Sequence, residues 1–209
     1  MEFDKKVIVI DDFYPDPYMM RDMALNAEYE PEGLDANYPG RNTTRSYWDT
    51  TITTMFSKAT GELVKPAKPS SCGYFRYTRK TDTGKQIVHF DPTPGQIWAG
   101  VVYLSLPEHY ENVVDAGTKI VSHKRTGMTV APKDYIESEA IGVKTFEDMR
   151  NFFETEGINN NLWKTELNVD NKFNRLVLFR PWMWHQIGQH FGTDINNSRL
   201  THLIFLQPG

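Results

Sequence analysis

The sequence predicts a mainly β protein of the α+β class, built as a jelly roll or a distorted barrel. Segments rich in β-branched and aromatic residues begin at Gly73 and are separated by turn residues, a pattern typical of antiparallel strands. Helical patterns precede these segments, and a helical insertion at residues 128–173 interrupts them. A chain of 209 residues suits a single domain over residues 1–209. In it, we expect residues 1–72 to support a core at 73–209.

The N-terminal part should contain a strand and two helices. Residues 6–11 (KVIVID) are apolar enough for a short buried strand. A helix follows, because Asp16 can accept hydrogen bonds from its first backbone amides and Pro17 suits its first position. Residues 31–71 predict loops, with a short helix near 51–60. The residues expected on the buried face of the first helix recur at helical spacing: Met20, Met23, Ala24 and Ala27.

The core strands and the insertion follow from the residue pattern. The strands are expected at 73–79, 86–91, 98–106, 117–123, 174–180 and 199–207. Within the insertion, residues 145–157 predict a helix, because Thr145 can cap its start and Gly157 can end it. The residues expected on its buried face are Phe146, Met149 and Phe153.

Composition and charge argue against several classes of protein. The formal net charge of −4 does not suit a nucleic-acid-binding surface, which is usually basic. No apolar run approaches the about 18 residues of a membrane span, and the N-terminus lacks a signal-peptide pattern. The single cysteine, Cys72, cannot form an intramolecular disulfide and is expected to be a buried thiol. We therefore expect a cytoplasmic protein that binds neither nucleic acid nor membrane.

The segment QIVHFDP (86–92) contains a candidate pair of metal ligands. On a strand, residues i and i+2 point to the same face, so His89 and Asp91 would share one side and Phe90 would point away. Pro92 cannot donate a ladder hydrogen bond, so the strand should end there and leave the pair at a rim. Taken alone, the pair also fits a strand-end histidine that is hydrogen-bonded to an acid.

Two further elements point to chemistry. His185 follows an apolar strand, and two histidines with one carboxylate form the ligand set of non-haem Fe(II) sites, although zinc also accepts it. The H-E-x-x-H motif of metalloproteases is absent. Arg199 and Thr201 share a face with Leu203 and Phe205, expected to be the barrel interior. A buried guanidinium needs an anionic partner, either a ligand carboxylate or an acidic side chain at the barrel mouth.

Several segments together resemble Fe(II)/2-oxoglutarate-dependent oxygenases, most closely the prolyl 4-hydroxylase-like group. The segment FRYTRKTDTGKQIVHFD resembles the strand, turn and H-x-D motif of that group. WAGVVYLSL and GTKIVSH resemble its next two strands. LVLFRPWMWHQIG resembles its strand with the distal histidine, and RLTHLIFL resembles its last strand. These matches occur in the order found in the group and cover about half of the chain.

The resemblance implies a double-stranded β-helix, which is a form of jelly roll. It implies Fe(II) as the metal and 2-oxoglutarate as a cosubstrate whose distal carboxylate pairs with Arg199. Thr201 and Tyr77 are implied as hydrogen-bond donors to that carboxylate. The residues that the resemblance assigns to Fe(II) are His89, Asp91 and His185.

The implied reaction is a hydroxylation by O₂ coupled to the oxidative decarboxylation of 2-oxoglutarate, with ascorbate as a supporting reductant. Its substrate would be a small molecule, or a prolyl or other residue of a peptide or protein. The long loop at 188–198 and the insertion at 128–173 depart from the group, which leaves the substrate open. Two other functions stay open: a cupin-like isomerase or hydrolase with zinc or manganese, and a binding module without catalysis.

Other candidate residues have two interpretations each. His123 lies at a strand end, where it can line the cleft or serve the structure. His202 should lie on the outer face of its strand. The loop at 38–49 carries arginines that can recognise an acidic or peptide substrate or remain solvated. Trp182 and Trp184 either shape the cleft or pack in the core.

Overall fold

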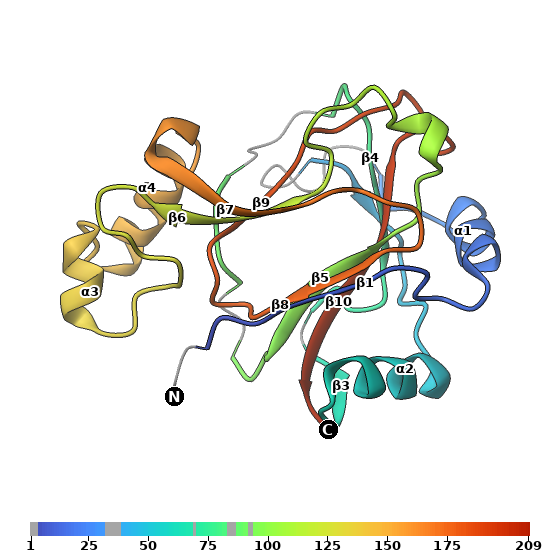
Figure 1. Cartoon of the computed structure of the whole chain (residues 1–209), viewed down its shortest axis with the longest axis horizontal. Coiled ribbons are helices and arrows are strands. Elements are labelled where there is room, and N and C mark those ends of the chain that lie inside the picture. The colour runs from blue at the N-terminus through green and yellow to red at the C-terminus, as the bar shows by residue number, and fades with distance from the viewer. Residues whose placement is uncertain (1–3, 32–38, 69, 83–86, 92–93) are drawn as a thin grey trace.

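The structure, a computed structural model, describes residues 4–31, 39–68, 70–82, 87–91 and 94–209. Within these residues, two antiparallel sheets face each other, with helices on both sides (Figure 1). The larger sheet has seven strands in the order β1-β8-β5-β10-β4-β2, with β3 also paired to β10. The smaller sheet has three strands in the order β7-β6-β9. The arrangement confirms the mainly β, α+β class.

The bounds of the elements are as follows. The larger sheet contains β1 (Val7–Ile10), β2 (Arg41–Asn42), β3 (Val64–Pro66), β4 (Phe75–Thr78), β5 (Trp98–Tyr103), β8 (Leu176–Phe179) and β10 (Arg199–Pro208). The smaller sheet contains β6 (Thr118–His123), β7 (Trp163–Val169) and β9 (His185–Ile187). The α-helices are α1 (Pro17–Leu25), α2 (Thr50–Thr60), α3 (Tyr135–Ala140) and α4 (Phe146–Thr155). Short 3₁₀ helices cover Pro107–His109 and Asn160–Leu162.

Apolar side chains form three clusters that follow the layers of the molecule. The first lies between the N-terminal helices and the outer face of the larger sheet, and includes Phe56 of α2 and Leu200 of β10. The second lies between the two sheets and includes Ile120 and Val177. The third lies between the smaller sheet and the α3–α4 segment, around Trp184. The N-terminal helices therefore cover the outer face of the larger sheet, and the α3–α4 segment packs against part of the smaller sheet (Figure 1).

Two predicted helix caps are present. The Asp16 side chain accepts a hydrogen bond from the Met19 amide at 2.9 Å and caps α1. The Thr145 hydroxyl accepts from the Asp148 amide at 3.1 Å, and the Asp148 carboxylate accepts from the Thr145 amide at 2.8 Å. This reciprocal capping box begins α4 where the sequence predicted its start.

The predicted buried faces of these helices are only partly correct. Met23 of α1 is 39% exposed, because Arg21 occupies the buried face and donates to the Leu104 carbonyl at 2.7 Å. Phe146 of α4 is 89% exposed, whereas Phe152 is buried against the smaller sheet. Helical spacing identifies a stripe of apolar residues, but the rotation of the helix depends on what it packs against.

The expected insertion contains a strand that the residue pattern did not reveal. β7 lies within 128–173, pairs with β6 and forms an edge of the smaller sheet. Residues 164–168 of this strand are exposed, so it lacks the apolar alternation of a half-buried strand. The α3–α4 part of the expected insertion lies outside the sheets. Residues 163–169 instead form a strand of the smaller sheet, so the prediction that they belong to a helical insertion was wrong.

Candidate metal centre

His89 and His185 are far apart in sequence and are joined by a backbone bridge. The amide of each residue donates to the carbonyl of the other, with N–O distances of 3.0 and 2.9 Å. Asp91 is held nearby, because its amide donates to the Pro181 carbonyl at 2.8 Å. The described part of the strand expected at 86–91 forms only this isolated bridge, so the expectation of a regular strand there is wrong. The predicted pairing of His89 and Asp91 on one side is observed.

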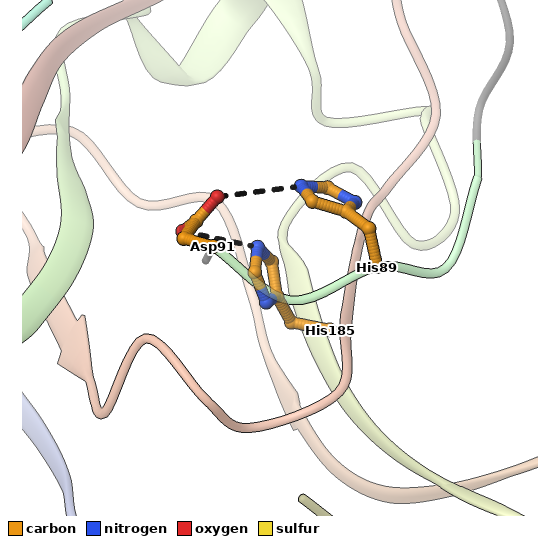
Figure 2. Close-up of side chains that lie close together, drawn as sticks. All are labelled: His89, Asp91 and His185. Atoms are coloured by element: carbon orange, nitrogen blue, oxygen red, sulfur yellow. Dashed lines mark ion pairs between the residues drawn. The ribbon is translucent and has the colours of Figure 1, made fainter. Parts of the chain in front are cut away.

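Figure 2 shows both imidazole rings turned toward the Asp91 carboxylate. Nε2 of His89 lies 3.8 Å from Oδ1 of Asp91, and Nε2 of His185 lies 3.7 Å from Oδ2. One candidate ligand atom from each of the three residues lies within 4.8 Å of the others. Such separations suit one divalent ion with ligand bonds of about 2.0–2.2 Å.

Each histidine ring is oriented through its second nitrogen. Nδ1 of His89 lies 3.0 Å from the Ile87 carbonyl oxygen, and Nδ1 of His185 lies 3.0 Å from the Met183 carbonyl oxygen. A carbonyl oxygen can only accept, so Nδ1 carries the proton in the neutral ring and Nε2 presents its lone pair toward Asp91. Metal-binding histidines usually have this arrangement, and the three residues therefore fit a divalent metal ion.

Burial favours the neutral forms of two candidate ligands, Asp91 and His185. Burial raises the pKa of Asp91, although a positive charge on His89 opposes the change. Burial also holds the pKa of His185 well below its usual range, and charge on His89 lowers it further. Neutral imidazole is the form that binds a metal, and a shielded carboxylate is stable as an anion only beside a cation. A bound divalent ion would satisfy both conditions.

A cavity of about 330 Å³ connects the three candidate ligands with Arg199. Arg199 begins β10 and is only 3% exposed. Leu203 and Phe205 line the same cavity, which confirms the prediction that they share a face with Arg199. Arg76 of β4 also lines it. The cavity thus places two guanidinium groups in the same space as the candidate metal ligands.

Arg199 contacts neutral groups. Its Nε donates to the Ala116 carbonyl at 3.4 Å, and its guanidinium carbon lies 5.4 Å from the centre of the Tyr103 ring. No ion pair among the described residues includes Arg199. Burial lowers the pKa of Arg199, and Tyr103 opposes this change. A buried charge without an opposite charge is costly, so an anionic ligand would stabilise this site.

Residues 2–206 match the model of a family described as a family of unknown function, DUF6445. The chain belongs to the DUF6445 family. The matched region includes both sheets, the α3–α4 segment and the candidate metal centre. A comparison with curated proteins found no match. In the part of this DUF6445 chain that the structure describes, no helix combines the length and the apolar character needed to cross a membrane.

Tyr77 lies on the wrong face of β4 for its predicted contact with an oxoacid. Its partner on β10 is Leu200, whereas Arg199 pairs with Thr78. The Tyr77 ring packs against Tyr29 at a centroid distance of 4.8 Å, in the cluster beneath the N-terminal helices. It is not among the residues that line the cavity. The prediction for Tyr77 was therefore wrong, because alternation along one strand does not reveal which face of the sheet turns to the cavity.

Tyr103 of β5 is the tyrosine beside Arg199 in this DUF6445 protein, and the sequence-based reasoning missed it. Tyr103 lies opposite Thr201, and its hydroxyl is 2.6 Å from Oγ1 of Thr118. The Thr201 hydroxyl donates to the Arg76 carbonyl at 3.4 Å, so its role toward a cosubstrate stays a prediction. A tyrosine in an otherwise apolar strand was the available signal, but its use required the register between β5 and β10.

Other aromatic and histidine residues serve the structure around the site. Phe90 points away from the ligands, as predicted, and its ring packs against Trp184 at a centroid distance of 4.9 Å. Trp184 is fully buried, so packing is its role. Pro92 lies outside the described residues. Nε2 of His123 is 2.8 Å from the Glu156 carboxylate, and His123 is not among the residues that line the cavity.

His202 and Cys72 both lie in the covered interior. His202 lies on the outer face of β10, away from Arg199, as predicted, but the N-terminal helices cover this face of the larger sheet and leave His202 fully buried. Its Nδ1 lies 2.7 Å from the Tyr14 hydroxyl. Cys72 is buried, as predicted, and burial raises the pKa of its thiol to about 12. Neither side chain is among the cavity-lining residues.

The loop expected at 38–49 is described from Pro39 onward and contributes Asn42 to the cavity wall. Oδ1 of Asn42 accepts a hydrogen bond from Arg76 at 2.8 Å. Trp182 is half-buried and is not among the cavity-lining residues. The loop therefore reaches the site through an amide side chain.

Proposed function

We propose that this DUF6445 protein is a non-haem Fe(II) dioxygenase that couples the oxidative decarboxylation of 2-oxoglutarate to the hydroxylation of a substrate. One observation carries the proposal: a single cavity contains a His-Asp-His set and the buried Arg199, which has no ion-pair partner among the described residues. A metal site alone needs only the first feature. A site for a dicarboxylic oxoacid uses both, because the metal binds one end and the guanidinium binds the other.

We also propose that the two sheets form a double-stranded β-helix. All strand pairs of the described residues are antiparallel, and neighbouring strands of the larger sheet come from distant parts of the chain. The candidate ligands and Arg199 line the space between the two sheets. The resemblance of the H-x-D, distal histidine and R-x-T segments to oxygenase strands supports the same fold.

In this proposal the three candidate ligands hold Fe(II) and leave adjacent positions open. Bound iron and 2-oxoglutarate supply the oxidising chemistry with O₂, and ascorbate is a supporting reductant. Arg199 binds the distal carboxylate and thereby orients the oxoacid, with the Tyr103 ring on one side of its guanidinium.

Two rival functions make different demands on the same residues. A cupin-like isomerase or hydrolase with zinc or manganese would use the three ligands, but it has no need for a buried arginine in the same cavity. A binding module without catalysis would not need to keep a complete ligand set with both rings oriented through Nδ1. Arg199 and the oriented ligands therefore favour the oxygenase.

Anaerobic titration of the protein with Fe(II) and then 2-oxoglutarate tests the proposal. We expect a weak visible charge-transfer band that requires both additions, and slow succinate formation once O₂ is admitted. His89→Ala should lose the band, and Arg199→Gln should shift its appearance to much higher 2-oxoglutarate concentrations. Well-folded protein that gives neither band nor succinate would refute the proposal. Tight binding of zinc without any effect of 2-oxoglutarate would favour the cupin-like alternative.

A further inference from the structure

The cavity beside the candidate metal centre extends along the inward face of β10. Arg199, Leu203 and Phe205 are separated by even numbers of residues on this strand, and all three line the cavity. With a rise of about 3.4 Å per residue, Phe205 lies roughly 20 Å along the strand from Arg199. The two residues therefore mark opposite ends of this face. An oxoacid bound at Arg199 leaves the Phe205 end for another ligand.

The metal centre adjoins the row of the larger sheet that contains Phe205. The ring of Phe179 packs on the ring of His185 at a centroid distance of 4.4 Å. Phe179 lies opposite Ala99 of β5, and Ala99 lies opposite Phe205. Directly opposed residues point to the same face, and β8 and β10 are two strand spacings, or about 9.6 Å, apart. The cavity therefore runs sideways from the metal centre toward Phe205.

The wall between the metal centre and Phe205 is apolar. Leu203 lies directly opposite Val101 of β5, and both line the cavity. Ile187 of the smaller sheet lines it as well. A polar group placed against this wall would lose its water without gaining a hydrogen bond, whereas an aliphatic group gains free energy by its burial. The part of a ligand that lies next to the metal centre should therefore be aliphatic.

Ser71 brings a hydroxyl group to the Phe205 end of the cavity. The chain before β4 runs along β10 here, because the Ala67 amide donates to the Phe205 carbonyl at 2.9 Å and the Gly73 amide donates to the Leu203 carbonyl at 2.8 Å. Ser71 lies between these two anchors and lines the cavity. Its hydroxyl has no hydrogen-bond partner within the described residues. It can therefore bind the polar end of a ligand, either as donor or as acceptor.

The two arginines of the cavity are directed away from Phe205. Arg199 lies at the opposite end of the inward face of β10. Arg76 of β4 donates to the Pro39 carbonyl at 2.6 Å and to Oδ1 of Asn42 at 2.8 Å, on the β2 side of the sheet. β10 lies on the other side of β4. A ligand at the Phe205 end is thus separated from both guanidinium groups, which favours an uncharged ligand there.

We propose that the substrate oxidised at this site is a small molecule with an uncharged aliphatic chain, which lies along Leu203 and Phe205 with its neutral polar end at Ser71. This inference rests on the proposed function, because it assigns the Arg199 end to the oxoacid. One oxygen atom of O₂ is inserted into a C–H bond of the chain, and the other oxidises 2-oxoglutarate to succinate and CO₂.

The size of the cavity limits the length of the chain. Small-molecule sites usually have about 300–1,000 Å³, and this cavity of about 330 Å³ also has to hold the oxoacid. The chain should therefore contain few carbon atoms. Phe205 stands at the end of the apolar wall and is thus the specificity-determining residue for chain length.

Proton relaxation measured on the full chain tests the assignment with unreactive probes. The protein is loaded with Mn(II) and N-oxalylglycine, an analogue of 2-oxoglutarate, and titrated with 1-propanol, 1-pentanol and 1-heptanol. Mn(II) accelerates the relaxation of nearby protons, and Zn(II)-loaded protein gives the diamagnetic baseline. We expect the terminal methyl protons to relax fastest, because the hydroxyl end lies at Ser71. Affinity should rise about fourfold with each added methylene and level off before 1-heptanol.

Matched variants separate the two ends of the chain. Ser71→Ala should weaken binding of 1-pentanol several-fold, because it removes one neutral hydrogen bond. Ser70→Ala is its control, since the Ser70 hydroxyl donates to the Ala67 carbonyl at 2.5 Å and is not part of the cavity wall. Phe205→Ala should extend the rise in affinity to 1-heptanol and leave N-oxalylglycine affinity unchanged. Phe205→Leu should give a smaller extension and serves if Phe205→Ala fails to fold.

The outcomes distinguish the inference from the function on which it rests. If N-oxalylglycine binds but no alcohol binds at about 100 mM, or if pentanoate or pentylammonium binds more tightly than 1-pentanol, the substrate assignment is wrong. Fastest relaxation of the protons beside the hydroxyl, or unchanged alcohol affinities in the Ser71 and Phe205 variants, would also overturn it. Failure of N-oxalylglycine to bind the Mn(II)-loaded protein would refute the proposed function itself.

Discussion

The two faces of β10 are similarly buried, yet their polar residues have different surroundings. His202 faces the N-terminal helices, where its Nδ1 meets the Tyr14 hydroxyl at 2.7 Å. Arg199 faces the cavity, where its contacts within the described residues are with a carbonyl oxygen and an aromatic ring. Burial therefore does not identify a functional residue by itself. The informative feature is a buried charge that faces a cavity and has no opposite charge beside it.

Arg180 strengthens this comparison because it is another buried arginine. Its Nε lies 3.1 Å from the Asp4 carboxylate, and its Nη2 lies 3.1 Å from the Glu62 carboxylate. It also stacks over Trp98, at 4.0 Å from the ring centre. Arg180 has the opposite charges that Arg199 lacks, so we expect mutations of the two residues to act in opposite ways on stability and on ligand binding.

Removal of a candidate metal ligand is expected to have the largest effect. His185→Ala should reduce the metal retained after gel filtration to near zero, because loss of a ligand exceeds the about 10–100-fold effect of losing an outer-shell partner. His202→Ala, on the other face of β10, should retain metal although it destabilises the fold. Elemental analysis of both variants measures this difference. Equal metal retention in the two variants would contradict the claim that His185 is a metal ligand whereas His202 only serves the structure.

Replacement of the two buried arginines by methionine comes next. Arg199→Met should raise the Kd for 2-oxoglutarate roughly 30-fold or more, since truncating one partner of a buried charge pair costs about 2–5 kcal/mol. Without ligand, its free energy of unfolding should be unchanged or higher, because an uncompensated buried charge has been removed. Arg180→Met should lower that free energy by about 2 kcal/mol, because it removes charged hydrogen bonds. Calorimetry and urea titration test the pair, and a loss of stability in Arg199→Met would contradict our interpretation.

The buried histidine should make folding sensitive to acid. The pKa of His202 is lowered to about 4 by burial, whereas an exposed histidine in the unfolded chain has a pKa of about 6.5. The unfolded state therefore binds the proton more tightly, and stability is full above about pH 6.5 and falls as the pH decreases toward 4. The total loss from this residue is about 3 kcal/mol.

Urea titrations of metal-free protein between pH 7 and pH 4 check this dependence. His202→Gln should have a shallower decline than the unsubstituted protein, because glutamine can still accept from the Tyr14 hydroxyl but does not titrate. His190→Gln should also make the decline shallower, since the pKa of His190 is likewise lowered to about 4. If His202→Gln keeps the full slope, the pH dependence comes from elsewhere.

The smallest expected effect distinguishes two tyrosines on opposite faces of the larger sheet. Tyr103→Phe should raise the Kd for 2-oxoglutarate several-fold, because a single neutral hydrogen bond contributes about 0.5–1.5 kcal/mol. Tyr77→Phe should leave that Kd unchanged, since Tyr77 packs beneath the N-terminal helices. Titration of both variants with 2-oxoglutarate in the presence of Mn(II) measures the difference. An effect of Tyr77→Phe alone would reverse our assignment of the faces.

Much of the candidate site could be predicted because it depends on residue type and order. His89, Asp91 and His185 stand out as ligand types, and Arg199 stands out as a charge in an apolar strand. Their proximity is now observed, although the binding of a metal stays a prediction. Arg76 was missed because an arginine in a strand next to polar turns resembles a surface residue.

The sequence by itself determined the class of the fold, the helix caps and which residues of one strand share a face. These properties depend on local geometry: the two-residue period of a strand and the unpaired amides of a helix start. Only the tertiary structure decided which face of the sheet turns to the cavity, and hence that Tyr103, and not Tyr77, lies beside Arg199. That choice depends on the register between strands and on the helices that cover the opposite face. Both are set by contacts between residues far apart in the chain.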